Sequence, residues 1–139
     1  RYPVFPVFGK GDYRLQPVFV EDLAEIAIEA GGKAESMVMD AVGPEIYTFD
    51  GLVKLIAEKI GSWTTIVHIN PDLALFLSGM VGSMVGDVLL TRDEVTGLMA
   101  GMLVSDRLPA GRTRLSEWLD RNANRVGKEY ASELQRHYR

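Results

Sequence analysis

The sequence contains no cysteine and only two histidines, His68 and His137. Without cysteine the chain can build no disulfide, no thiol nucleophile and no cysteine-ligated zinc site. Neither histidine has a second ligand at the spacing that metal sites use, so we predict no metal site. The lack of cysteine is compatible with a reducing compartment, and we therefore expect a cytoplasmic location.

The sequence also has no large excess of charge of one sign, with a net charge of −4. Its most basic stretch is residues 112–139, where seven Lys/Arg stand against four Asp/Glu. Because those acidic residues interrupt the basic ones, the stretch is typical of a solvated helix face and not of a nucleic-acid contact. We expect no nucleic-acid partner.

The longest apolar run, residues 73–90, is interrupted by glycines and by Asp87. A buried or lid helix is favoured over a membrane span, and peripheral membrane contact is the weaker alternative. Gly79, Gly82 and Gly86 do not form a dinucleotide loop, because a predicted helix and not a strand precedes them. Met80 and Met84 offer an adaptable apolar surface, so they are candidate binding residues for a lipophilic small molecule.

A chain of 139 residues that is 47% hydrophobic can bury one core. Its first residues include no initiator methionine and no signal-peptide pattern, and they read as the middle of a longer protein. We therefore expect a single domain over residues 1–139 that is a fragment of a larger chain.

Hydrophobic periodicity and capping residues predict an α+β fragment with three or four short strands and about six helices. The predicted strands are Pro17–Val20, Met37–Val42 and Thr64–Ile69, with Val4–Phe8 as an extended edge or loop. The predicted helices begin at caps or proline signals: Asp22, Thr48, Asn70-Pro71, Thr91 with Glu94, Thr113 or Ser116, and a last one near Val126.

Four segments, in order along the chain, carry a family resemblance: QPVFVEDLAEIAIEA (16–30), AVGPEIYTFDGLVKLIAEKIG (41–61), LLTRDEVTGL (89–98) and GRTRLSEWLDRN (111–122). Together they resemble the NAD-dependent epimerase/dehydratase family, the extended or atypical short-chain dehydrogenases/reductases. The branch that includes the nucleotide-binding accessory subunit of respiratory complex I is the most similar.

The resemblance implies that this chain is the C-terminal, substrate-binding half of a Rossmann-type α/β protein whose N-terminal dinucleotide-binding domain is absent. That missing domain would be its partner and would hold NAD or NADP, while the fragment itself binds no cofactor. Residues 37–42 would join the edge of the missing sheet, and a bare edge would allow a homodimer.

The family's catalytic tyrosine is followed four residues later by a lysine that lowers its pKa. None of the five tyrosines here is followed by lysine at that spacing. We therefore predict no catalytic residue in this chain.

Candidate substrate-binding residues flank the strand-to-helix segment on the side of the family's cleft: Lys10, Tyr13, Arg14 and Gln16. They compete with an interpretation as ordinary loop residues. Arg14 lies one position from the arginine that grips nucleotide-sugar phosphates in the family, where Leu15 stands instead, which argues against such a substrate. His68, within the predicted strand 64–69, is a further candidate, although a structural role is the commoner one for such a histidine.

Two functions stay open. The first is the substrate-binding portion of an NAD(P)-dependent epimerase/dehydratase-like or reductase-like protein, with a small-molecule, lipophilic substrate and no turnover by the fragment alone. The alternative is a non-enzymatic nucleotide-binding scaffold or regulatory subunit of a respiratory or quinone-linked complex. A self-contained helical interaction module is a third and weaker hypothesis.

Overall fold

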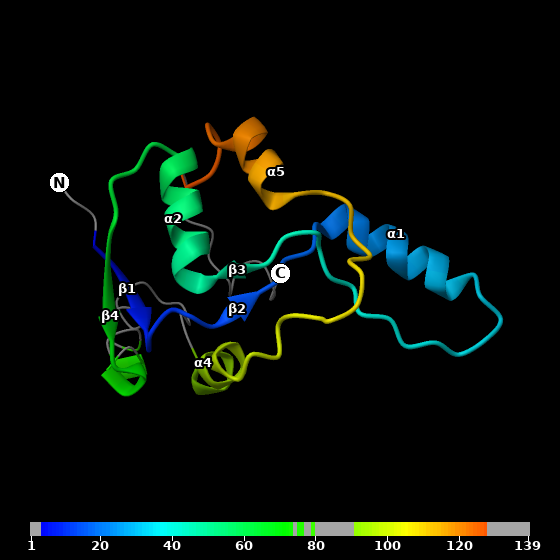
Figure 1. The fold of residues 1–139 in the computed structure, drawn as a ribbon, viewed down its shortest axis with the longest axis horizontal. Helices are drawn as coiled ribbons and strands as arrows, with labels where there is room; N and C mark the ends of the chain where they lie inside the picture. Colours follow the sequence, from blue (N-terminus) through cyan, green and yellow to red (C-terminus); the bar gives the residue numbers. More distant parts are fainter. Residues whose placement is uncertain (1–3, 74, 77–78, 80–90, 128–139) are drawn as a thin grey trace.

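The computed structural model describes residues 4–73, 75, 76, 79 and 91–127. Along the chain the elements are β1 (Val4–Phe8), β2 (Arg14–Leu15), α1 (Val20–Gly31), β3 (Tyr47–Thr48), α2 (Phe49–Lys59), β4 (Thr65–Ile69), α4 (Arg92–Met99) and α5 (Leu115–Asn122) (Figure 1). The predicted α+β class is confirmed at this level. The predicted last helix lies almost wholly outside the described residues, as does most of the apolar run.

Two small sheets form the strand content of the described residues. Strands β1 and β4 pair in parallel from Val4 with Thr65 to Phe8 with Ile69, and β2 pairs antiparallel with β3. Figure 1 shows the β1–β4 sheet at one end of an elongated molecule, with α1 at the other end and α2 and α5 side by side between them.

An aromatic core, consisting of Phe8, Tyr13, Phe49 and Val95, holds the sheet end together. The Phe8 and Tyr13 rings stack with centroids 5.4 Å apart, and the Tyr13 and Phe49 centroids are 5.1 Å apart. Such ring pairs add to the free energy that burial of their apolar area supplies. The core joins the β1 end, the β2 loop, α2 and α4.

Two of the predicted helix caps are confirmed, whereas α5 begins after Arg114 and not at a cap formed by Thr113 or Ser116. Thr48 Oγ1 accepts a hydrogen bond from Gly51 N at 3.0 Å at the start of α2. Thr91 and Glu94 form the predicted reciprocal capping box of α4. Each satisfies backbone N–H groups that have no partner within the helix.

Two predicted strands are wrong. Of the predicted strand Pro17–Val20, residues 17–19 belong to no strand and Val20 is already the first residue of α1. Residues 37–42 form no strand either, and Val38 is 86% exposed. β propensity alone does not make a strand, because a strand needs a neighbour at hydrogen-bonding distance. The edge on which the predicted homodimer rested is therefore not formed by residues 37–42.

Val4–Phe8, in contrast, is a true strand despite Pro6. In a two-stranded sheet one side of the strand has no ladder partner, so a proline without an N–H is tolerated there. Among the described helices, none has the length and apolar character to span a bilayer.

Candidate functional site

Gln16 is a predicted site residue whose side chain binds two distant segments of the chain. The residue is buried, with 9% of its surface exposed. The amide Nε2 donates to Gly43 O at 2.8 Å, and Oε1 accepts from Ser105 N at 3.0 Å. One carboxamide therefore joins its own segment to two others, which are 27 and 89 residues away in sequence.

These three segments enclose a groove of about 610 Å³, which we call the central groove. Its lining residues are Leu15, Gln16, Pro17, Val18, Asp40, Ala41, Val42, Met102, Leu103, Val104 and Ser105. The backbone of the first two segments is closely packed, since a Cβ on Gly43 would lie 2.0 Å from Pro17 O. The volume is in the range of small-molecule sites.

One end of the central groove is polar. Ser105 Oγ donates to Asp40 Oδ2 at 2.6 Å, and Arg107 Nε lies 3.8 Å from the same carboxylate oxygen. Arg107 also donates to Val38 O at 3.3 Å. Asp40 thus lies between a hydroxyl and a guanidinium, and the rest of the lining is mostly apolar.

Tyr13 is not at the groove but in the aromatic core, 7% exposed. Its hydroxyl has no hydrogen-bond partner among the described residues. Burial, and then the negative charges of Asp50 and Asp12, raise the pKa of Tyr13 well above its usual value. The side chain is therefore a core residue that stays neutral.

Lys10 and Arg14 are exposed, and neither lines the central groove. Arg14 belongs to β2, where it is paired with Thr48. Of the four residues predicted before α1, Gln16 is the one that lines the central groove.

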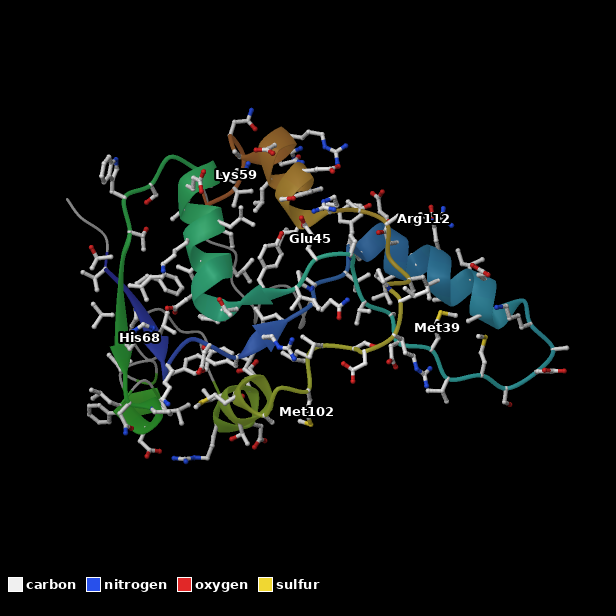
Figure 2. The ribbon with its side chains drawn as sticks, in the orientation of Figure 1. Met39, Glu45, Lys59, His68, Met102 and Arg112 are labelled. Atoms are coloured by element: carbon white, nitrogen blue, oxygen red, sulfur yellow. The ribbon has the colours of Figure 1, made fainter. Side chains whose placement is uncertain are left out.

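His68 lies on β4, at a distance from the groove rim residue Met102 (Figure 2). Its Nε2 is 2.9 Å from Asp50 Oδ2 and 3.1 Å from Oδ1. Gly11 allows this pair, because a Cβ there would lie 2.0 Å from Asp50 Oδ1 and its φ is +67°. His68 thus links β4 to the start of α2. Met80 and Met84 lie outside the described residues.

Asp22, predicted as the cap of α1, has a different role. The N-cap is Phe19, and the Asp22 carboxylate accepts from Arg112 N and Thr113 N at 2.7 Å each and from Thr113 Oγ1 at 2.9 Å. The backbone N–H of Thr113 is the main cause that lowers the pKa of Asp22. We call these contacts the Asp22 anchor; no local sequence signal indicates a partner 90 residues away.

A second carboxylate, Glu45, holds the same part of the chain from the other side. It accepts from Ser116 Oγ at 2.6 Å, Ser116 N at 3.0 Å and the Tyr47 hydroxyl at 2.6 Å, and Arg114 lies 3.0 Å away. Burial acts to raise the pKa of Glu45, but the hydrogen bonds from Ser116 and Tyr47 and the charge of Arg114 outweigh it and lower the pKa to about 2. Burial, followed by the adjoining Glu45, raises the pKa of Tyr47 to about 12. We call these contacts the Glu45 anchor.

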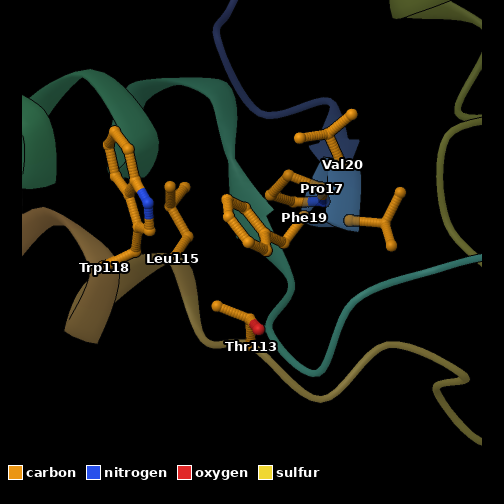
Figure 3. Close-up of a pocket in the computed structure, with 7 residues that line it drawn as sticks. Pro17, Phe19, Val20, Thr113, Leu115 and Trp118 are labelled. Atoms are coloured by element: carbon orange, nitrogen blue, oxygen red, sulfur yellow. The ribbon is translucent and has the colours of Figure 1, made fainter. Parts of the chain in front are cut away.

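An apolar pocket of about 180 Å³ adjoins the Asp22 anchor, which contributes Thr113 to its lining (Figure 3). It is lined by Pro17, Val18, Phe19, Val20, Thr113, Leu115 and Trp118. The rings of Phe19 and Trp118 have centroids 6.5 Å apart. The hydroxyl of Thr113 is bound by Asp22, so the pocket has no free charged group among its lining residues and differs in this from the central groove.

No group of three or more His, Asp or Glu side chains suitable for a metal ion occurs among the residues with described positions. The absence of a metal site stays a prediction for the whole chain.

No protein-family model matches the sequence. A curated protein from Arabidopsis thaliana, named NADH dehydrogenase [ubiquinone] 1 alpha subcomplex subunit 9, mitochondrial, is 25% identical over 117 residues. The match covers 76% of this chain and 29% of that relative, so the chain spans less than a third of the relative's length.

The similarity to this relative bears on two predictions from the sequence, the family resemblance and the cellular location. Its name supports the predicted resemblance to the accessory-subunit branch at a coarse level. The predicted cytoplasmic location is wrong, because the relative is a mitochondrial protein. The lack of cysteine on which that prediction rested does not distinguish one reducing compartment from another.

Proposed function

We propose that this chain is the C-terminal, ligand-binding portion of an accessory subunit that associates with a respiratory NADH dehydrogenase. The observation that carries the proposal is the similarity to the plant subunit over 76% of the chain. An N-terminal Rossmann-type domain of the same protein would hold NAD or NADP, and this portion would pack against it.

The positions of the ionisable groups support a role in binding over one in catalysis. Among the described residues, the carboxylates of Asp22 and Glu45 hold loop segments, and Tyr13 is enclosed by other rings. The His68–Asp50 pair joins β4 to α2 and lines neither the central groove nor the apolar pocket. A general base needs a place for substrate within hydrogen-bond reach. In the central groove the ionisable lining residue is Asp40, whose carboxylate is held by Ser105 Oγ and lies near Arg107.

The test is to tag the intact protein in its own organism and separate detergent-solubilised respiratory membranes on a native gel. We expect the tag to migrate with NADH dehydrogenase activity. Migration at the mass of the free protein, with no tag in the active band, would refute the proposal.

A second candidate is an active NAD(P)-dependent reductase or epimerase, and the central groove with Gln16 in its lining favours it. The two candidates differ in the N-terminal half, where a tyrosine followed four residues later by lysine would support an enzyme. NAD(P)-dependent turnover by the purified intact protein would favour this candidate over the accessory subunit.

A further inference from the structure

We propose that the central groove binds a neutral amphiphile, a small molecule with an uncharged hydrogen-bonding head on an apolar body, and not a phosphorylated ligand. The inference deepens the proposed function, since it names the ligand class of the portion that we take to be ligand-binding. It is carried by the lining of the groove.

The head-group end is built around Gln16. A carboxamide has two N–H donors and two acceptor lone pairs. The hydrogen bonds to Gly43 and Ser105 use one donor and one acceptor, and they fix the orientation of the side chain. The other donor and the other acceptor of the carboxamide have no partner among the described residues, and a ligand with an amide, a hydroxyl or another group that both donates and accepts would complement them.

The charges around the groove disfavour an anion. Asp40 is the sole charged residue among the lining residues that the structure describes. Arg107 does not line the groove. Its Nε lies 3.8 Å from the Asp40 carboxylate, and its guanidinium donates a hydrogen bond to Val38 O. Phosphate sites use several cationic or backbone N–H donors, and the positive charge of Arg107 is already balanced by Asp40.

The body of the ligand would lie on apolar walls. Seven of the lining side chains are aliphatic or proline, and Met102 adds a flexible thioether that is 71% exposed at the rim. Methionine adapts its shape to differing apolar ligands. Figure 2 shows Met102 at the edge of the molecule, on the far side of the strands from Lys59.

The experiment uses the intact protein labelled with ¹³C on methionine methyl groups, with the Met102 signal assigned from a Met102→Leu variant. The probes are octanamide and octanoate, which share a chain length and differ in head-group charge, and UDP-glucose as a phosphorylated ligand. We expect octanamide to shift the Met102 signal saturably, with at least fivefold higher affinity than octanoate and no saturable shift with UDP-glucose.

Met99 is the internal control, because it lies against Gly9 and does not line the groove. Equal shifts of Met99 and Met102 would mean nonspecific partitioning and would overturn the proposal. Octanoate or UDP-glucose binding as tightly as octanamide would overturn it as well.

Two variants test the named groups. Gln16→Leu is expected to weaken octanamide binding about three- to tenfold, provided that the methyl spectrum shows a folded protein. Asp40→Asn, which keeps the side-chain shape, is expected to reduce the preference for octanamide over octanoate to about twofold. Asp106→Asn, an exposed carboxylate outside the groove, should leave the preference unchanged; an equal loss with Asp106→Asn would contradict the role of Asp40.

A negative methyl titration would refute the ligand class of the central groove without refuting the proposed function. Co-migration with NADH dehydrogenase does not require a ligand in the groove, so the native gel and the methyl titration give independent answers.

Discussion

The two ends of the molecule are held together by different physical means. At the sheet end, the aromatic core packs the ends of β1, β2, α2 and α4 around Phe8 and Tyr13. At the α1 end, the Asp22 and Glu45 anchors bind the segment around the start of α5, and the apolar pocket lined in part by Thr113 is partly open. The central groove lies where these two regions meet.

The difference has a consequence for stability. Burial of apolar area does not depend on pH, whereas a carboxylate anchor is lost when the carboxylate is protonated. We therefore expect the sheet end to respond mainly to loss of volume and the α1 end mainly to loss of charge.

The largest effect is expected from Phe8→Ala. It removes a ring that is 7% exposed and stacked on Tyr13, so the free energy of unfolding should fall by about 3–5 kcal/mol. Urea unfolding followed by circular dichroism measures it. Phe76→Ala, at a residue that is 65% exposed, is the matched control and should cost much less. Equal losses would mean that the aromatic core is not the stabilising centre of this end.

Glu45→Gln should have the next largest effect. The amide cannot accept all four contacts from Ser116, Tyr47 and Arg114, so we expect a loss of about 2 kcal/mol in unfolding free energy. Glu117→Gln is the control, since that exposed carboxylate lies 3.7 Å from Arg114, and such surface pairs contribute little. A similar loss in both variants would argue against the Glu45 anchor.

As the pH falls, the contacts of the Asp22 and Glu45 anchors should be lost before the aromatic core unfolds. The folded pKa of Glu45 is about 2, below its usual value of 4.5, so its stabilising contribution is complete above about pH 4.5 and is lost as the pH falls towards 2. The pKa of Asp22 is lowered too, with the same sign. Trp118 fluorescence in a Trp63→Phe background should report the change, and the Glu45→Gln variant should show a smaller one. An acid transition unchanged by Glu45→Gln would contradict the assignment.

The smallest effect should come from Tyr13→Phe. The Tyr13 hydroxyl is buried without a partner among the described residues, so its removal should change the unfolding free energy by less than about 0.5 kcal/mol or raise it. Tyr47→Phe removes a hydroxyl that donates to Glu45 at 2.6 Å and should cost about 1–2 kcal/mol. Equal changes in unfolding free energy for the two variants would contradict the difference between the aromatic core and the Glu45 anchor.

The sequence predicted the local features well and the distant ones poorly. Thr48 and the Thr91–Glu94 box act on N–H groups three residues away, so the pattern contains both partners. Asp22 resembles a cap in the sequence, yet its partners are Arg112 and Thr113, which no periodicity connects to it. Residues 37–42 have strand composition, but no described strand lies beside them.

The candidate site divides in the same way. Gln16 was predicted from its position before α1, and the structure places it in the lining of the central groove. Tyr13 was predicted beside it, but its ring packs against Phe8 and Phe49 in the aromatic core. Asp40, Met102 and Ser105 were not predicted, because only the fold brings residues 40–42 and 102–105 together.

The proposed function, a portion of an accessory subunit, predicts that assembly of the respiratory NADH dehydrogenase depends on the intact protein and not on turnover by it. The most direct measurement is the amount of assembled respiratory NADH dehydrogenase in a strain that lacks the gene, with and without the intact protein restored. We predict a reduced level that the restored protein brings back to normal. A full level of active, assembled enzyme in the strain without the gene would contradict the account.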